Sequence, residues 1–388
     1  MKVTKVTATV HRLAPLGDTY WGARTWGGPA RTDGDDYPPA ARRRYVYSPT
    51  IDTVLVRVDT DEGVTGWGEC KAPVAAPATA AIVTELLSPM VTGTRISELA
   101  VTWERMYTAM RVRGHDAGFW LEALSGVDIA LWDAWSRTLG QPIHALLGGT
   151  YRTEVPVYAS GLPAAASHEQ LDGLRDSARR LKDAGWTAVK VAIGLRPSLD
   201  VASVAVVREV FDTVFADAAG QYDLAQAIRV GRSLEELGVG FFEMPIPPEH
   251  IEGYARLASI LNIPLALDSI PNRYRALEYL RTGALGVLQP DVCRAGGITE
   301  VMRIAVLADA FGAITTPHVS IGSPVHFAAS LQCAAAIPNF HIMEHWIGDN
   351  PLDAISADAQ PPRNGHRAVT TTPGLGITVE PASSPAAR

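Results

Sequence analysis

Seven ionisable side chains recur at nearly equal intervals, each within or at the end of a short apolar run. They are Lys190, Asp217, Glu243, Asp268, Asp291, His318 and Glu344. The intervals between them are 27, 26, 25, 23, 27 and 26 residues. We refer to these seven as the ladder residues. Five of them are carboxylates, and gathering so many at one place is costly unless a cation compensates them. A hard divalent ion such as Mg²⁺, which takes oxygen ligands, would provide that charge.

The order of the ladder residues suggests a role for each. Asp217, Glu243 and Asp268 follow one another and form the natural set of metal ligands. Asp291 and His318 come next, and an aspartate beside a histidine fixes its tautomer and raises its basicity, which makes a general base. Any one of these residues alone could be a solvated group at a strand end or a structural histidine. Their regular spacing favours a shared function.

The two remaining ladder residues complete a site for proton abstraction. Glu344 could exchange a proton from the opposite side of the metal, and Lys190 could pair with an anionic substrate. Removing a proton from the carbon next to a carboxylate produces a dianionic enediolate. A metal and a nearby lysine stabilise that charge, and a histidine beside the carbon takes the proton.

Alternating strands and helices must carry these residues. The β-rich runs are 155–160, 187–194, 213–217, 239–245, 263–269, 285–291, 313–318 and 340–345. Eight such runs separated by helical stretches indicate parallel β/α topology, and a closed barrel brings all strand ends to one mouth. An open doubly wound sheet would need a glycine-rich phosphate loop after its first strand, which this sequence lacks. Ser167 and Gln170 predict a capping box, and Gly185 and Gly238 predict helix ends.

The chain divides into three zones. Residues 1–130 predict an α+β domain that opens with a strand at 3–10 and contains a hairpin ending near Glu69. Its long segment 13–47 has no periodicity but carries aromatic residues, which favours a functional lid. Residues 131–353 predict the barrel, and residues 354–388 a C-terminal return with a strand at 376–380.

Composition excludes several classes of protein. Lys and Arg number 34 against 41 Asp and Glu, a net charge of −7 without a basic patch, so no nucleic-acid partner is expected. Cys70, Cys293 and Cys333 are far apart, as in a cytoplasmic protein with reduced thiols. The first residues lack the apolar run of a signal peptide, and no apolar stretch predicts a membrane span.

Three longer motifs carry a family resemblance. They are SGVDIALWDAWSRTLGQPIHALLGGTYRTEVPVYAS at 125–160, QPDVCRAGGITE at 289–300 and PHVSIGSP at 317–324. Through them the whole chain resembles the enolase superfamily, and within it the mandelate racemase branch. The resemblance implies an α/β fold: a modified TIM barrel, (β/α)₇β, with an α+β capping domain formed by the N-terminal region and the C-terminal tail. It also implies Mg²⁺, a small-molecule carboxylate substrate and a homo-oligomer.

The resemblance also assigns residues. Asp217 and Glu243 match the first two metal ligands, Asp291 and His318 the catalytic dyad, and Glu344 the acid on the last strand. Tyr158 and Ser160 lie where residues of the first strand often touch substrate, and Trp21 and Arg24 are candidate substrate contacts in the lid.

The sequence also departs from the family pattern at four places. Ala192 replaces the second lysine of Lys-x-Lys, Ala219 an asparagine and Met244 a glutamate. Asp268-Ser269 stands where the branch has a glutamate as third ligand, and Asp268 matches the aspartate of the muconate-cyclising branch.

These departures leave a single base. With no lysine at position 192, only His318 can abstract the α-proton, which suits syn elimination of a β-hydroxyl from a hydroxy acid. We therefore expect an acid-sugar dehydratase. A cycloisomerase or epimerase of a sugar acid or lactone is the alternative, and a degenerate homologue that only binds a ligand is the alternative of a different class.

Overall fold

Eight parallel strands form the barrel in the computed structural model, which describes residues 1–14, 48, 50–358 and 361–380. In sheet order from one end, the strands are β10 (Ile314–Thr315), β9 (Val287–Leu288), β8 (Leu265–Leu267), β7 (Phe242–Glu243), β6 (Thr213–Asp217), β5 (Ala188–Ala192), β4 (Glu154–Pro163) and β11 (Met343–Trp346). A bridge between Thr315 and Phe340, just before β11, joins the two ends. This confirms the predicted closed barrel.

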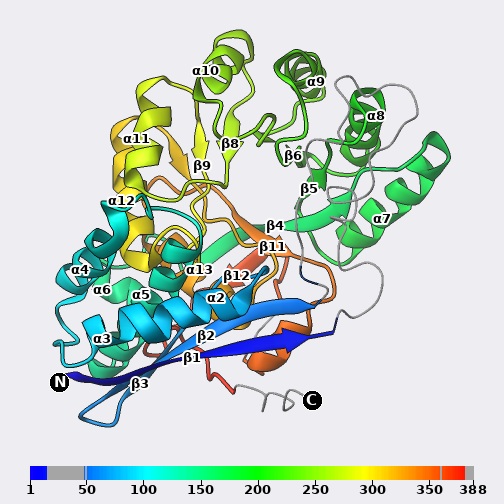
Figure 1. Ribbon diagram of the computed structural model, residues 1–388. Helices are drawn as coiled ribbons and strands as arrows, with labels where there is room; N and C mark the ends of the chain where they lie inside the picture. Colours follow the sequence, from blue (N-terminus) through cyan, green and yellow to red (C-terminus); the bar gives the residue numbers. More distant parts are fainter. Residues whose placement is uncertain (15–47, 49, 359–360, 381–388) are drawn as a thin grey trace.

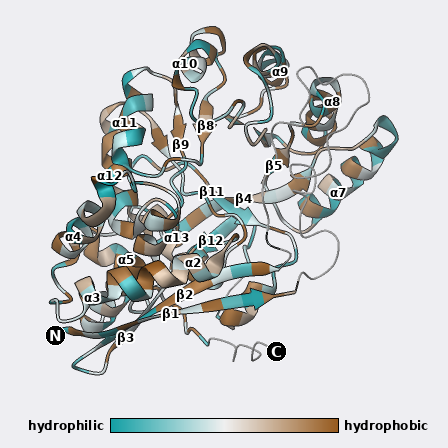
Figure 2. Cartoon of the chain, viewed as in Figure 1, coloured by the Kyte–Doolittle hydropathy of each residue, from teal (hydrophilic) through white to brown (hydrophobic). Residues whose placement is uncertain are grey.

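Helices surround the strands (Figure 1). Along the chain they are η3 (His168–Gln170), α7 (Leu171–Asp183), α8 (Pro197–Arg208), α9 (Leu224–Glu236), α10 (Ile251–Ile260), α11 (Arg273–Arg281), α12 (Gly297–Ala310) and α13 (Pro324–Ala336). Figure 2 shows polar and apolar residues alternating along α7 and α11, while β8 and β9 are apolar. Helices such as α7 and α11 thus turn an apolar stripe towards the strands, as expected where helices cover a buried parallel sheet, whereas α13 is buried along almost all of its length.

A layer of apolar side chains fills the barrel directly beneath the ladder residues. It consists of Tyr158, Ala188, Phe215, Phe241, Ala266, Val287 and Ile342. Because side chains on a strand point to the same side every second residue, Phe215 lies one layer below Asp217 and Phe241 one layer below Glu243. The rings of Phe215 and Phe241 stack with centroids 4.1 Å apart. This packed floor forces the polar side chains towards the mouth.

A second domain, which we call the cap, covers that mouth. Its antiparallel sheet consists of β1 (Val3–Leu13), β2 (Ile51–Thr60) and β3 (Thr65–Cys70), and the predicted hairpin is confirmed as β2 and β3. Its helices are α2 (Ala76–Ala81), η2 (Ile82–Leu87), α3 (Ser88–Val91), α4 (Leu99–Arg111) and α5 (Phe119–Thr138). A Cβ at Gly68 would lie 2.0 Å from the carbonyl oxygen of Gly126, so only glycine allows β3 to pack this closely on α5.

Helix α5 also fastens the cap to the barrel. Trp132 Nε1 donates to Thr299 Oγ1 (2.8 Å), and both carboxylate oxygens of Asp128 accept hydrogen bonds from Thr299. Short α6 (Ile143–Leu146) follows α5 and leads into β4.

All three cysteines are buried and free. Among the described residues, no helix combines the length and apolar character that crossing a membrane would require.

The C-terminal segment differs from the prediction. After η4 (Pro351–Ile355), β12 (His366–Ala368) pairs antiparallel with β4 of the barrel. The strand expected at 376–380 is absent, because Gly374 and Gly376 both adopt φ of 78°, which breaks an extended backbone. The segment instead reaches α5 through side chains, since Asp133 accepts from the Leu375 amide (2.8 Å) and Arg137 donates to the Ile377 carbonyl (2.9 Å).

One predicted helix cap is also wrong. Ser167 makes no capping hydrogen bond, and Gln170 Oε1 instead accepts from the Ala166 amide (2.9 Å), because the chain enters α7 through the 3₁₀ turn η3. The predicted helix ends at Gly185 and Gly238 are confirmed, with φ of 91° and 69°.

Candidate active site

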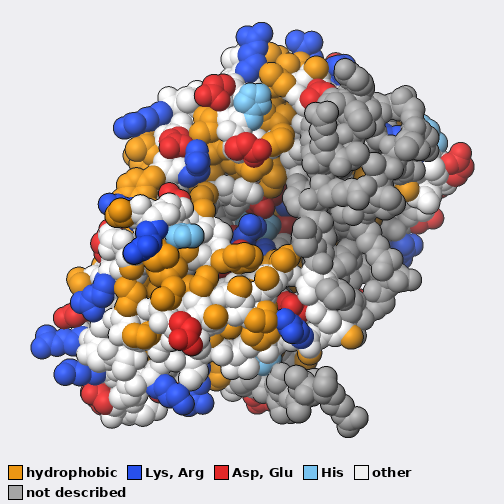
Figure 3. Space-filling model, in the orientation of Figure 1, with side chains coloured by type: hydrophobic (Ala, Val, Ile, Leu, Met, Phe, Trp, Pro, Cys, Tyr) orange, Lys and Arg blue, Asp and Glu red, His pale blue; other side chains and the backbone are white. Residues whose placement is uncertain are grey.

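The ladder residues meet at one cavity between the barrel mouth and the cap. Its volume is about 450 Å³. Five of the seven line it, namely Lys190, Asp217, Asp268, His318 and Glu344, and Glu243 lies behind them against Lys190. Asp291 lies directly behind His318. Figure 3 shows charged side chains in the hollow between the two domains. The arrangement follows from the fold, since the C-terminal ends of parallel strands converge on one face.

Lys190 lies at the centre of the carboxylates. Its Nζ is 2.8 Å from both Glu243 Oε2 and Glu344 Oε1, and 3.7 Å from Asp217 Oδ2. Only 5% of the Lys190 side chain is exposed, so these contacts take the place of water. Asp268 lies at the edge of the group and accepts from Ser269 Oγ (3.0 Å). Three carboxylates therefore share one ammonium group, with Asp268 beside them.

The surplus of negative charge shows in the pKa values. Burial raises the pKa of Asp217 to about 6, although Lys190 opposes the shift, and Asp268 adds to it by repulsion. Burial also raises the pKa of Glu243 well above its usual range, again against the effect of Lys190. Donor atoms of Glu243, Asp268 and His318 lie within 4.8 Å of one another. This cluster contains two of the three predicted metal ligands and has His318 in place of Asp217. Oxygen donors that are short of positive charge fit a hard divalent ion.

Asp291 and His318 form a hydrogen-bonded pair. His318 Nδ1 lies 2.9 Å from Asp291 Oδ2. Burial alone would raise the pKa of Asp291, but His326 and Lys71 hold it well below its usual range. An ionised Asp291 can only accept, so Nδ1 of a neutral His318 donates and Nε2 carries the free lone pair. Nε2 faces the cavity, 3.4 Å from Glu344 Oε2 and 3.7 Å from Asp268 Oδ2.

Glu344 occupies the position between the lysine and the histidine. It accepts hydrogen bonds from Ser160 Oγ and from the backbone amide of Val319 (3.1 Å). Burial opposes ionisation, but Lys190 and His318 lower its pKa to about 2.

Of the two residues predicted on β4, Ser160 lines the cavity. Tyr158 lies one layer deeper, fully buried against Phe215, and does not reach it. Trp21 and Arg24 lie outside the described residues, as does almost all of the segment 13–47.

The side of the mouth formed by β5, β6 and β7, across from His318, carries three apolar residues next to Lys190, Asp217 and Glu243. Ala192, Ala219 and Met244 line it. In the sheet register Ala192 pairs with Asp217, so a lysine at position 192 would have lain beside the carboxylates. Ala219 and Met244 have φ of 46° and 38°, a conformation that costs a non-glycine residue roughly 1 kcal/mol or more.

Sequence reasoning missed the cap's contribution to the site. Lys71 Nζ donates to Asp291 Oδ2 (2.9 Å), and Glu69 accepts from the backbone amides of Ser323 and His326 at the start of α13. Glu122 and Arg294 also line the cavity, 3.7 Å apart, and burial raises the pKa of Glu122 to about 7. The one signal in the sequence that could have indicated this contribution was the pair of charged residues, Glu69 and Lys71, on either side of Cys70 at the end of the hairpin.

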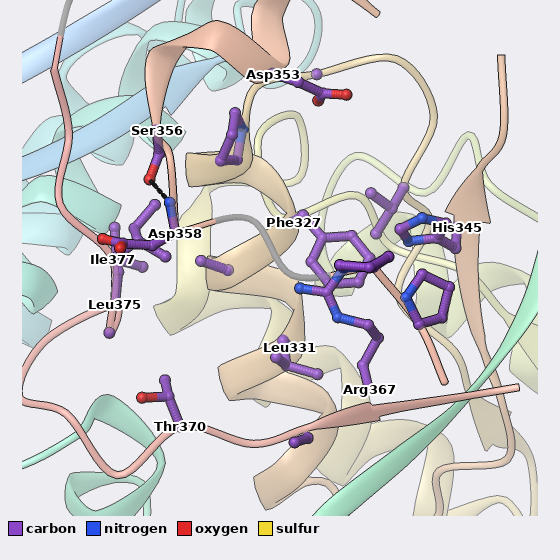
Figure 4. Close-up of a pocket in the computed structure, with 18 of the residues that line it drawn as sticks. Phe327, Leu331, His345, Asp353, Ser356, Asp358, Arg367, Thr370, Leu375 and Ile377 are labelled. Carbon is purple, nitrogen blue, oxygen red and sulfur yellow. Dashed lines mark hydrogen bonds between the residues drawn. The ribbon is translucent and has the colours of Figure 1, made fainter. Parts of the chain in front are cut away.

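A second, larger cavity of about 750 Å³ lies between α13, η4 and β12 (Figure 4). Arg367 rises from β12 and stacks on Phe327, with Cζ 4.4 Å from the ring centroid, and His345 packs beside the ring in a T-shaped arrangement, with ring centroids 5.0 Å apart. None of the ladder residues lines this cavity. It shares Ser320 and Trp346 with the first cavity, but it lacks the carboxylates and the base.

Comparisons with known proteins identify the family of this chain. Residues 48–148 match the N-terminal domain of mandelate racemase and muconate lactonizing enzyme, and residues 173–383 match the enolase C-terminal domain-like family. The chain is 35% identical to D-galactarolactone cycloisomerase of Agrobacterium fabrum over 84% of this chain and 88% of the relative. It is 31% identical to arabinonate dehydratase of Saccharolobus solfataricus over 85% of this chain and 88% of the relative.

Solved structures give the same result. The 3,6-anhydro-D-galactonate cycloisomerase from Zobellia galactanivorans superposes with a TM-score of 0.82 at 26% identity, covering 98% of this chain and 97% of that one. A member of the enolase superfamily from Agrobacterium tumefaciens superposes with a TM-score of 0.87 at 26% identity, covering 98% and 97%. The chain therefore belongs to the mandelate racemase/muconate lactonizing enzyme family of the enolase superfamily.

Proposed function

We propose that this enzyme is a Mg²⁺-dependent acid-sugar dehydratase that uses His318 as its only base. The observation that carries the proposal is the contrast between the two sides of the mouth. His318 presents a free Nε2 on one side. On the other side Ala192, Ala219 and Met244 supply no base, and the one lysine there, Lys190, is held by Glu243 and Glu344. A site with one base suits removal and return of a proton on a single face of the substrate.

The residues present fit a divalent ion. Asp217, Glu243 and Asp268 would hold it, because their combined charge exceeds what Lys190 can offset. When bound, Mg²⁺ would supply Lewis-acid stabilisation of the substrate carboxylate. Lys190 would stabilise the same carboxylate from the side of β5, since its Nζ already lies among the acidic groups.

The proposed reaction proceeds in two proton transfers. His318 Nε2 takes the α-proton, and the electrons of the broken C–H bond form the enediolate. As the enediolate collapses, the β carbon–oxygen bond breaks, and the imidazolium returns its proton to the departing hydroxyl, which leaves as water. The resulting enol tautomerises to a 2-keto acid. Asp291 stabilises the imidazolium between the two transfers, because its carboxylate remains ionised.

Glu344 would act on the other side of the developing charge. Its carboxylate is fixed by Ser160 and by the Val319 amide, and it lies close to His318 Nε2. In this position it can accept a hydrogen bond from a substrate hydroxyl near the base. It has a low pKa of about 2, so it enters the reaction ionised unless the substrate or a metal displaces Lys190.

A cycloisomerase is the second candidate. The 35% identical relative is a D-galactarolactone cycloisomerase, and the Zobellia structure is also a cycloisomerase. Opening a lactone ring by elimination needs the same single base, with a ring oxygen as the leaving group instead of a hydroxyl. A protein that only binds a ligand is less well supported, because His318 lies 2.9 Å from Asp291 Oδ2 through Nδ1 and 3.4 Å from Glu344 Oε2 through Nε2, as a catalytic base would.

Product analysis separates these functions. The enzyme is incubated with Mg²⁺ and a panel of aldonic acids, aldaric acids and their lactones. Formation of a 2-keto acid with loss of water supports the dehydratase, whereas an isomer of unchanged mass supports the cycloisomerase. His318→Asn should remove both activities and the exchange of the substrate α-hydrogen in D₂O, while circular dichroism remains unchanged. Full activity in that variant would refute the assignment of His318 as the base.

A further inference from the structure

Lys71 crosses from the cap to the barrel. It follows β3 directly, and its Nζ donates to Asp291 Oδ2 (2.9 Å) and to Ser320 Oγ. Its backbone amide donates to the Cys293 carbonyl (3.3 Å). Only 8% of the side chain is exposed. One ammonium group therefore joins the loops after β9 and β10, which carry Asp291 and His318.

Asp291 is held from four directions. Oδ2 accepts from Lys71 and faces His318 Nδ1, both at 2.9 Å. Oδ1 accepts from the Cys293 amide (2.9 Å) and lies 3.1 Å from His326 Nε2. Of these four groups, Lys71 is the one from the cap and the one that offers an ammonium group. Without it, a buried carboxylate would be left with a backbone amide and two imidazoles, and it could turn towards His326.

We propose that Lys71 is a positioning residue for the base. It acts through Asp291 to keep the imidazole of His318 in the orientation and tautomer in which Nε2 faces the substrate. The proposal rests on the function proposed above, because it assumes that His318 abstracts a proton. Removing the partners that orient metal-ligating histidines typically changes activity by about 10- to 100-fold, and we take that range for Lys71.

A direct contact with substrate is the competing role for Lys71. The side chain lines the cavity, so a substrate oxygen could reach it. Against this, its Nζ is already engaged by two protein oxygens and lies on the His318 side of the mouth. The two roles differ in kinetics, because loss of a binding contact raises KM, whereas loss of a positioned base lowers kcat.

Three variants test the proposal in the full-length, Mg²⁺-supplied enzyme. Lys71→Met removes the charge, Lys71→Arg keeps it, and Trp132→Phe removes a hydrogen bond between cap and barrel away from the cavity. We expect Lys71→Met to lower kcat and α-hydrogen exchange by about 10- to 100-fold with KM within about threefold. Lys71→Arg should recover much of this loss, and Trp132→Phe should match the wild type.

Imidazole ¹⁵N NMR gives a readout that does not need turnover. The His318 ring signals are identified by their loss in His318→Asn. In the wild type they should report protonated Nδ1 and unprotonated Nε2, and in Lys71→Met a mixture of tautomers. Unchanged ring signals, unchanged kcat, or a rise in KM alone would each overturn the proposal. If no acid is turned over but the ring signals change in Lys71→Met, the positioning role stands and the proposed function fails.

Discussion

Mg²⁺ should stabilise this protein, and the stabilisation should weaken as the pH falls. The reason is the shortage of positive charge around Lys190, which faces Glu243, Glu344 and Asp217 at once. An ion that binds only the folded state at about 100 times its dissociation constant adds roughly 2.7 kcal/mol to the free energy of unfolding. Protons compete with the ion for the same oxygens.

The pKa of Asp217 sets the size of that competition. With a pKa of about 6, Asp217 is roughly one-tenth protonated at pH 7 and nine-tenths at pH 5. The apparent affinity for Mg²⁺ should therefore fall about tenfold between these pH values, which is about 1.4 kcal/mol. The raised pKa of Glu243 makes the fall steeper.

Without the ion, the pH dependence has the opposite sign. A carboxyl whose pKa is raised in the folded state contributes stability at low pH, and this contribution is lost as the pH rises through the folded pKa. For Asp217 the loss occurs as the pH rises from its ordinary pKa of 3.8 to about 6, and it is on the order of 3 kcal/mol. Mg²⁺ should therefore restore most stability near neutral pH.

Thermal unfolding at matched ionic strength tests this reasoning. The wild type is compared at pH 5 and pH 7, with MgCl₂ or with NaCl. Asp217→Asn and Glu243→Gln should lose most of the Mg²⁺ effect, whereas Asp309→Asn, on an exposed position of α12, should keep it. Equal stabilisation at both pH values, or in all variants, would refute the assignment of these carboxylates to a metal site.

Three further predictions concern single residues. Asp268→Ala should weaken Mg²⁺ binding by about tenfold or more in titration calorimetry, since fewer charged ligands lower affinity; unchanged affinity would place the third ligand elsewhere. Ala192→Lys should place a base beside Asp217 and allow α-hydrogen exchange of the C2 epimer of the substrate in D₂O, followed by proton NMR. If no new exchange occurs, a base at position 192 does not reach the opposite face of the substrate. Gly68→Ala should cost about 3 kcal/mol or more in denaturant unfolding, because its Cβ would lie 2.0 Å from the Gly126 carbonyl oxygen; wild-type stability would contradict the close packing.

The sequence predicted the barrel and the ladder for the same reason. One β/α unit repeats after each ladder residue, so a regular interval along the chain becomes a ring in space. The sequence could not predict how deep a given side chain lies along the barrel axis. Tyr158 and Ser160 point to the same side of β4, yet only Ser160 reaches the mouth, because Tyr158 belongs to the apolar floor.

Contacts between the domains were beyond sequence reasoning. Lys71 and Asp291 are 220 residues apart and have no periodic relation, so no local pattern links them. Strand propensity also misled at 376–380, where isoleucine, threonine and valine favour a strand but the glycine at 376 turns the chain. In the first case the contact leaves no local signal in the sequence, and in the second the tertiary structure overrides a local strand propensity.

The position of Glu69 has a consequence for how such enzymes can be recombined. This buried carboxylate accepts hydrogen bonds from Ser323 Oγ and from the amides of Ser323 and His326, and so anchors the first turn of a barrel helix to a strand of the other domain. A chimera that joins this barrel to a relative's N-terminal domain would therefore inherit a different anchor for that turn. In such a chimera, residues 69–71 would have to be taken from the same protein as the barrel, although they belong to the N-terminal domain in the sequence.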